Sequence, residues 1–268
     1  LDEELGRDGF KFYSGVGDRN LLVWSGGRGE VEASNLSLTP PHDITGELID
    51  NYLPEGPTAE RFIELQDRAS RILAGKDESF NGIWLWGQGV KPDLPTFKER
   101  YGLDGVVVSA VDLIKGLGAY SGLTPIEVEG ATGSIDTNYE GKVSAVEENL
   151  ESGSIAYLHI EAPDEASHAG NLEKKIKAIE LIDRRIVKFL LDFLDRRGDS
   201  RLLLVTDHLT GIESRTHERG PVPFAITEFN RHGNSSGTEY SEREAAHAGK
   251  ELDTGAELLK LFLNGEVG

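Results

Sequence analysis

The chain has 268 residues, enough for one large or two modest domains, since a domain usually has about 100–200 residues. It carries 28 Lys and Arg residues against 47 Asp and Glu residues, and the resulting net charge of -19 argues against a surface for nucleic acid or anionic membranes. It has no cysteine, which excludes disulfides, thiolate metal ligands and a cysteine nucleophile. With no apolar run near the ~20 residues that span a bilayer, we expect a cytoplasmic protein whose partner is a small molecule.

The first part of the chain, residues 1–97, is rich in glycine, proline and turn dipeptides. Short apolar runs predict strands at Phe10–Tyr13 and Leu21–Trp24 and a third strand over 82–86. Apolar residues at helical spacing predict a helix over 58–73. This part is therefore expected to form a small α+β unit.

The second part, residues 98–268, alternates predicted strands and helices. The strands are expected at 106–109, 126–128, 155–160, 202–205 and 222–226, and the helices at 111–116, 142–150 and 171–197. Proline in the last strand indicates an edge or a strand start, and residues 230–240 are expected to form a loop. The alternation predicts an α/β fold with a largely parallel sheet covered by helices.

Three loops at strand ends carry residues that bind metals. Asp164 and His168 follow the strand at 155–160, and Asp207 and His208 directly follow the strand at 202–205. His217 lies just before the strand at 222–226. Since loops at the carboxyl ends of α/β strands surround the ligand crevice, these side chains are expected to share one pocket.

Carboxylates and neutral imidazoles are suitable ligands for Mn²⁺ or Zn²⁺. Two such ions about 3.5–4 Å apart can hold the attacking and leaving oxygens of a displacement at phosphorus. The alternative is that the aspartates are helix caps or turn formers and the histidines ordinary core or surface residues. Three of the seven histidines lie beside strand ends with carboxylates close by in the sequence, which favours the metal interpretation.

These residues carry a resemblance to a known family. The segments Asp164-x-x-x-His168, Thr206-Asp207-His208 and Thr216-His217, followed by Pro221-Val222-Pro223, resemble the three metal motifs of cofactor-independent phosphoglycerate mutases, in the alkaline phosphatase superfamily. Residues 40–46, 83–89, 109–116 and 130–142 are similar to segments of the archaeal-type branch, which also occurs in bacteria.

The resemblance implies a fold, an activity and a set of ligands. It implies an alkaline-phosphatase-like α/β core and an enzyme of glycolysis and gluconeogenesis that interconverts 3-phosphoglycerate and 2-phosphoglycerate without bisphosphoglycerate. It further implies that Asp164, His168 and His217 hold one divalent ion and that Asp207 and His208 hold a second. Mn²⁺ is the first expectation for both ions, with Zn²⁺, Co²⁺ and Mg²⁺ as alternatives.

Family members complete the site with an aspartate and a nucleophilic serine that accepts the phosphoryl group. Both lie in an N-terminal segment, an apolar strand ending in Asp-Gly and a following loop, that has no counterpart in residues 1–268. We therefore expect the catalytic serine to lie outside this sequence and the 268-residue chain alone to be inactive.

Residues 1–97 would then be the inserted lid domain that holds the substrate, and residues 98–268 the metal-binding core. A carboxylate and a phosphate require guanidinium or ammonium partners. The candidates for substrate binding are Arg19, Lys91, Lys115, His42 and Asp43. Each cation could equally be an ordinary solvated side chain, and the Pro-Pro sequence before His42 is also typical of a turn.

The remaining histidines have simpler interpretations. His159 is expected in the core, and His232 and His247 on the surface. Two other functions stay open: a phosphate-ester hydrolase of the same superfamily, and a non-catalytic protein that binds metal or a phosphometabolite. The sequence makes no prediction of oligomeric state.

Overall fold

The structure, a computed structural model, describes residues 1–15, 20–25, 35–41, 44, 46–76, 80–229 and 239–264. The chain forms two compact units, Leu1–Leu94 and Pro95–Gly268. The roles of lid domain and metal-binding core stay predictions for the two parts of the chain.

The first unit packs one helix against a small two-stranded sheet. Its elements are α1 (Asp2–Leu5), β1 (Phe10–Tyr13), β2 (Leu21–Trp24), η3 (Ile49–Tyr52) and α3 (Ala59–Leu73). β1 and β2 are antiparallel, with Phe10 opposite Trp24. The buried face of α3 presents Phe62, whose ring meets those of Phe10 and Trp24 at centroid distances of 5.8 and 5.4 Å. The predicted strands at 10–13 and 21–24 and the predicted helix are confirmed.

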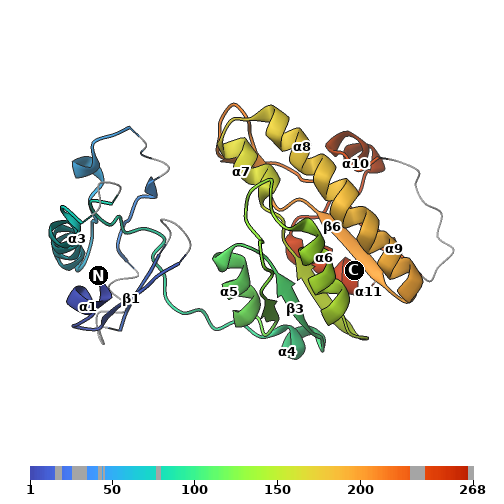
Figure 1. The fold of residues 1–268 in the computed structure, drawn as a ribbon, viewed down its shortest axis with the longest axis horizontal. Helices are drawn as coiled ribbons and strands as arrows, with labels where there is room; N and C mark the ends of the chain where they lie inside the picture. The colour runs from blue at the N-terminus through green and yellow to red at the C-terminus, as the bar shows by residue number, and fades with distance from the viewer. Residues whose placement is uncertain are drawn as a thin grey trace. The chain divides into compact units, whose positions relative to one another are not determined.

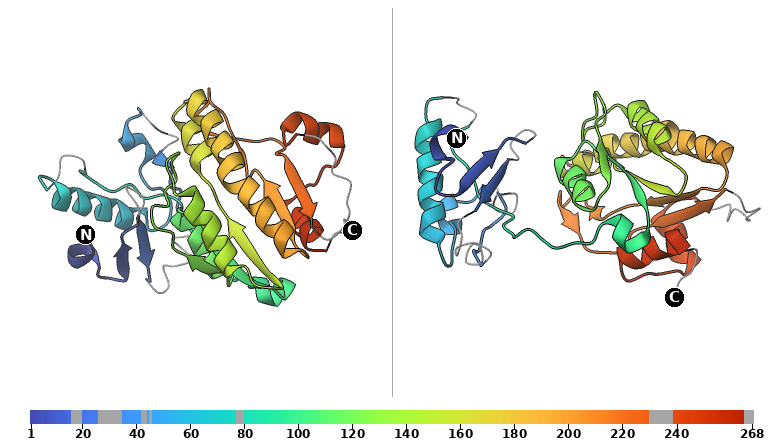
Figure 2. Two further views of the ribbon diagram at one scale, coloured as in Figure 1. Left: turned by 45° about the vertical axis from the view of Figure 1, so that its right-hand side comes forward. Right: turned by 90° about the horizontal axis from the view of Figure 1, so that it is seen from below.

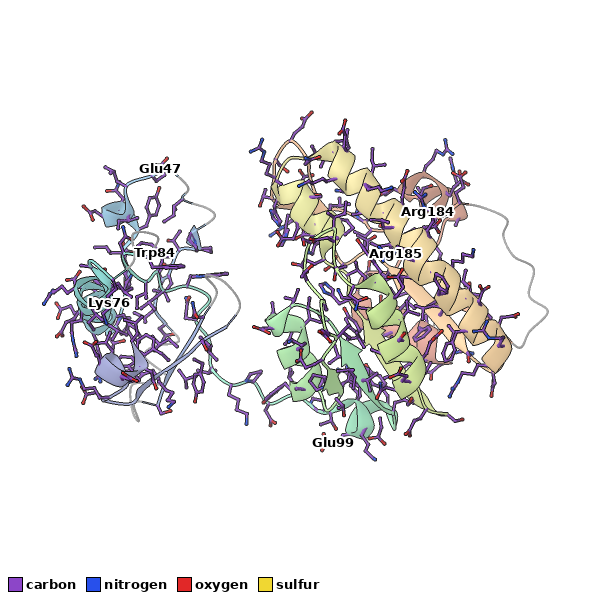
Figure 3. The ribbon with its side chains drawn as sticks, in the orientation of Figure 1. Glu47, Lys76, Trp84, Glu99, Arg184 and Arg185 are labelled. Atoms are coloured by element: carbon purple, nitrogen blue, oxygen red, sulfur yellow. The ribbon has the colours of Figure 1, made fainter. Side chains whose placement is uncertain are left out.

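The predicted third strand at 82–86 is wrong, because these residues have no regular structure. Ile83 and Leu85 pack against the apolar cluster of the first unit. The Trp84 indole, labelled in Figure 3, donates a hydrogen bond to the Thr39 carbonyl at 2.8 Å, and Gln66 donates to the Ile83 carbonyl at 3.3 Å. The apolar alternation thus reflects burial of side chains, and at Ile83 the Gln66 side chain provides the partner that a neighbouring strand would otherwise give to the carbonyl.

The second unit contains strands and helices in alternation (Figure 1). Its strands are β3 (Asp104–Val108), β4 (Thr124–Ile126), β5 (Ser154–Leu158), β6 (Arg201–Val205), β7 (Leu209–Thr210), β8 (His217–Glu218) and β9 (Phe224–Glu228). Its helices are α4 (Phe97–Tyr101), α5 (Asp112–Tyr120), α6 (Tyr139–Asn149), α7 (Ala162–His168), α8 (Leu172–Ile182), η4 (Asp183–Val187), α9 (Lys188–Arg197), α10 (Glu242–Ala248) and α11 (Gly255–Asn264).

A parallel sheet in the order β4-β3-β5 lies at the centre of the second unit. The predicted α/β fold, a parallel sheet flanked by helices, is confirmed. One pairing differs from a simple parallel arrangement, since β6 pairs antiparallel with β9 in a sheet of its own. Pro223 comes directly before β9, in agreement with the prediction that this proline marks a strand start. The strand predicted at 126–128 begins two residues earlier than expected, at Thr124.

The core of this unit lies between β3 and the helices on one face of the sheet. Val108 of β3 is fully buried there, in one cluster with Tyr139 of α6 and Ile186 of η4. Its neighbour Val107 is also fully buried and points to the other face of the sheet, where it packs against α5. Figure 1 shows α6 lying beside the long α8–η4–α9 helix, and Figure 2 shows α11 on the opposite side of the strands. Close packing on β3 also requires a glycine in α5, because a Cβ on Gly118 would lie 2.4 Å from a methyl carbon of Val107.

Asparagine side chains cap the starts of two helices of the second unit. Asn138 accepts from the Gly141 amide at the start of α6, and Asn171 accepts from the Lys174 amide at the start of α8. Arg185, labelled in Figure 3, pairs with Glu140 and so ties the long helix to α6.

Among the described residues, no helix is long and apolar enough to cross a membrane.

Candidate metal centre

The structure brings the predicted ligands of the three loops together. Asp164 and His168 are four residues apart on α7, a spacing that places both on one face of a helix. His208 lies directly before β7, and His217 begins β8. β7 and β8 form an antiparallel hairpin in which Thr210 lies opposite His217, and this register carries His217 back to the cluster.

The central contacts join Asp164 to two histidines. Its carboxylate oxygens lie 3.3 Å from His168 Nε2 and 3.5 Å from His217 Nε2. The two Nε2 atoms are 3.2 Å apart. The rings of His208 and His217 contact each other at a tilt of 37°, with centroids 3.9 Å apart. Asp164, His208 and His217 each offer a ligand atom within 4.8 Å of the others.

Asp207 lies at the outer side of this cluster. Its Oδ2 is 3.4 Å from His208 Nε2, and its Oδ1 accepts from the His208 amide at 3.0 Å. The Asp207 side chain is 62% exposed, whereas that of Asp164 is 22% exposed. The five predicted ligands thus form one continuous group, with Asp164 at its inner end and Asp207 near solvent.

Hydrogen bonds behind the rings determine which nitrogen faces the cluster. His168 Nδ1 lies 2.8 Å from the Arg215 carbonyl oxygen, which can only accept, so Nδ1 carries the hydrogen. Its Nε2 lone pair then points toward His217 and Asp164. Arg215 holds this carbonyl in place with a left-handed backbone, φ 56°, a conformation that costs a non-glycine residue about 1–3 kcal/mol.

Thr210 performs the same function for His208. Its hydroxyl donates to Asp164 Oδ1 at 2.6 Å and lies 3.1 Å from His208 Nδ1. Because the single hydroxyl hydrogen goes to Asp164, the oxygen accepts from His208 Nδ1, and the His208 Nε2 lone pair is left for the cluster. Lys175 in turn donates to the Thr210 carbonyl at 2.8 Å.

This donor set fits a divalent cation. Two imidazole nitrogens at 3.2 Å need a proton or a cation between them, and a carboxylate faces both. Carboxylate and imidazole ligands oriented by hydrogen bonds from behind are typical of catalytic metal sites. Burial and the neighbouring His208 lower the pKa of His217, which favours the neutral form that a metal requires.

The predicted substrate residues are distributed differently. Lys115 on α5 binds Glu127 at 3.0 Å and Asp112 at 3.3 Å, and these partners raise its pKa although burial acts in the opposite direction. Lys91 lies in the irregular segment of the first unit. The other three candidates lie outside the described residues; they are Arg19, His42 and Asp43.

Two of the other histidines can be placed. His159 is partly buried, with Nδ1 3.2 Å from Ser109 Oγ and Nε2 3.4 Å from Glu161, and burial lowers its pKa. Its side chain is only 14% exposed, in agreement with the expected core position, and both ring nitrogens have polar partners. His247 is exposed on α10, as predicted, and His232 lies outside the described residues.

Sequence reasoning missed Thr210 and Lys175. The signal for Thr210 was present, since residues two apart in an extended segment point to the same side, and Thr210 comes two residues after His208. Nothing in the sequence distinguishes Lys175 from the other lysines of the long helix.

Comparison with known proteins agrees with this geometry. The model of the Metalloenzyme superfamily matches residues 15–263, which is most of the chain. The chain belongs to the metalloenzyme superfamily. Within this superfamily it is 43% identical to a probable 2,3-bisphosphoglycerate-independent phosphoglycerate mutase of Geobacter sulfurreducens, over 97% of this chain and 66% of the relative.

Two further curated proteins are similar to the same extent. A 2,3-bisphosphoglycerate-independent phosphoglycerate mutase of Methanosarcina acetivorans is 44% identical over 93% of this chain and 64% of its own length. One of Methanothrix thermoacetophila is 45% identical over 96% and 67%. The solved structure of the PH0037 protein from Pyrococcus horikoshii matches 69% of this chain and 57% of its own, with a TM-score of 0.53 and 26% identity. The chain thus spans about two thirds of the length of its curated relatives.

Proposed function

We propose that the complete protein is a phosphoglycerate mutase that interconverts 3-phosphoglycerate and 2-phosphoglycerate without bisphosphoglycerate. The observation that carries this proposal is the convergence of Asp164, His168, His208 and His217 from three separate segments of the chain onto one centre. The names of the relatives support the choice of reaction. The phosphoryl group would be accepted by a serine outside residues 1–268.

We further propose two divalent ions at this centre, with Mn²⁺ as the first choice. Asp164, His168 and His217 would hold one, and Asp207 and His208 the other. Such ions neutralise and orient a phosphoryl group during its transfer. A substrate with a carboxylate and a phosphate is anionic, and the chain has a net charge of -19. The ions would therefore supply the local positive charge that attracts this substrate to the site.

The ligand-holding residues have defined tasks in this proposal. The Arg215 carbonyl and the Thr210 hydroxyl keep hydrogens on the Nδ1 atoms of His168 and His208, so that both Nε2 atoms face inward. Lys115, Lys91 and Arg19 are the proposed partners of the substrate anions, and His42 and Asp43 the proposed residues for orientation or proton transfer.

Product analysis with the complete protein and 3-phosphoglycerate tests the reaction. A mutase converts it to 2-phosphoglycerate with little free phosphate, whereas a hydrolase of the same superfamily releases phosphate. A protein that only binds metal or a phosphometabolite would form neither product. The His208→Ala variant should lose product formation, and the His247→Ala variant, changed on the exposed face of α10, should keep it.

A further inference from the structure

Three buried polar side chains connect the central strand of the second unit to the helix of the metal ligands. Ser109 follows β3, His159 follows β5, and Glu161 comes directly before α7. Ser109 is 5% exposed, and the side chains of His159 and Glu161 are 14% and 16% exposed. We call these three residues the Ser109 network. Buried polar groups cost free energy unless they are paired, so their presence together needs an explanation.

The hydrogen bonds of the Ser109 network have one direction. Ser109 Oγ accepts from the Val111 amide at 3.0 Å and lies 3.2 Å from His159 Nδ1. The hydroxyl hydrogen has no other acceptor among the described residues, so it is donated to Nδ1. Burial lowers the pKa of His159 and keeps the ring neutral. The ring hydrogen therefore lies on Nε2, which is 3.4 Å from the Glu161 carboxylate.

The residue types are those of a Ser-His-acid catalytic site, but burial argues against a nucleophile. A nucleophilic serine has to touch the substrate, whereas Ser109 is almost completely enclosed by protein. The network is therefore expected to act on the protein itself, and the element that it reaches is α7.

Helix α7 is short and has few anchors of its own. It has seven residues, and an isolated helix of this length is not stable in water. Asparagine side chains cap α6 and α8, whereas the Glu161 side chain makes no cap hydrogen bond to α7 and pairs with His159 instead. The buried residues of α7 are small and remove little apolar area from water; they are Ala162, Ala166 and Ser167.

Glu161 is also joined directly to a predicted metal ligand. Its carbonyl accepts from the Asp164 amide at 2.9 Å, in the first turn of α7. Burial lowers the pKa of His159, and the charges of Asp207 and Asp164 act in the opposite direction, so the imidazole lies within electrostatic range of both aspartates. A displacement of Glu161 would therefore displace Asp164.

We propose that the Ser109 network is a positioning device, which ties the start of α7 to β3 and so holds Asp164 ready for a divalent cation. A ligand that is fixed before the cation arrives loses less freedom on binding. Groups behind the ligands of a metal contribute about 10–100-fold in affinity. The inference rests on the proposed metal centre, but not on the reaction that the centre catalyses.

Calorimetric titration of the complete, metal-free protein with Mn²⁺ tests the proposal. Ser109→Ala and Glu161→Ala should each lower the affinity about 10-fold. Glu161→Gln removes the same charge as Glu161→Ala, but its amide oxygen can still accept from His159 Nε2, so most of the affinity should remain. Ser200→Ala is the matched control, because it removes a half-buried hydroxyl bonded to a backbone carbonyl before the start of β6, and it should leave the affinity unchanged.

The ring of His159 gives a second readout that needs no metal. Two-bond ¹H–¹⁵N NMR spectra of the complete wild-type protein at pH 7 should show the hydrogen of His159 on Nε2. A hydrogen on Nδ1 would mean that Ser109 does not donate to the ring, and it would overturn the proposal.

The titration separates this inference from the proposed metal centre. Wild-type binding of Mn²⁺ with equal affinity in Ser109→Ala and Glu161→Ala would overturn the positioning role, and a lower free energy of unfolding in both variants would then show that the network only supports the fold. Absence of Mn²⁺ binding by the wild-type protein would instead refute the centre itself, and this inference with it.

Discussion

The predicted metal ligands and the predicted substrate cations differ in how well the sequence placed them. All five predicted ligands lie together in the second unit, at positions fixed by strand ends and by a hairpin register. Of the predicted cations, Lys115 already has two carboxylate partners and Arg19 lies outside the described residues. Spacing on a helix or directly after a strand predicts where a side chain lies, but it does not predict which carboxylates a lysine such as Lys115 pairs with.

The largest expected effect comes from removing a ligand. Asp164→Ala or His208→Ala in the complete protein should lower kcat at least 1000-fold and reduce bound metal, while circular dichroism stays unchanged, because a ligand rather than core volume is lost. Metal analysis by mass spectrometry together with kcat checks this. His247→Ala is the matched control. Unchanged metal occupancy in both ligand variants would contradict the assignment.

Thr210→Val should have the next largest effect. The variant keeps the side-chain shape but loses the hydroxyl that orients Asp164 and fixes the hydrogen of His208, and such partners contribute about 10–100-fold in metal affinity. Calorimetric titration with Mn²⁺ measures the change, and Thr210→Ser should restore most of the affinity. Equal affinity of the valine variant would show that Thr210 has no positioning role.

Lys115 allows a test of whether a predicted substrate cation contacts the substrate. If it binds substrate, Lys115→Met should raise KM for 3-phosphoglycerate about 10-fold, the loss of one charge-assisted hydrogen bond, without changing metal content. Glu127→Gln is the matched control, since it frees the lysine from one partner and should leave KM equal or lower. An unchanged KM with reduced stability would limit Lys115 to its ion pairs.

The smallest expected effect concerns the buried Lys142, whose contribution to the free energy of unfolding should depend on pH. Burial lowers its pKa to about 8 from 10.5, and its ammonium lies 3.5 Å from the carbonyl oxygens of Thr132 and His159. Between these pH values the unfolded chain holds a proton that the folded chain has released, so the free energy of unfolding should rise with pH over this range.

Denaturant unfolding at pH 7 and pH 10 measures this contribution. Lys142→Met should increase stability at pH 7 by about 1–3 kcal/mol and remove the rise toward pH 10. Lys188→Met, at an exposed position on α9, should change neither. A wild-type protein whose stability does not rise above pH 8 would contradict the lowered pKa.

Much of the fold could be predicted because burial leaves a periodic trace. The helix at Ala59–Leu73 and the long helix from Leu172 to Arg197 follow apolar spacing closely. The segment 82–86 shows the weakness of this trace, since Ile83 and Leu85 are apolar for packing without strand pairing. The antiparallel pairing of β6 and β9 was also hidden, because strand direction leaves no mark on the period.

The site could be predicted for a different reason. Asp164 and His168 share a helix face by spacing, and Asp207 and His208 follow a strand directly, so chemistry and position agree. The two-residue spacing from His208 places Thr210 on the same side of the chain, but the task of its hydroxyl could not be predicted, because threonine is common in strands and that task depends on the tautomer of His208.

In the proposed centre, three separate segments of the chain hold two divalent cations together. Anomalous X-ray diffraction from crystals of the complete protein grown with Mn²⁺ tests it most directly. We predict one anomalous peak bound by Asp164, His168 and His217 and a second beside Asp207 and His208. The absence of a peak at these side chains, with Mn²⁺ bound elsewhere or not at all, would contradict the account.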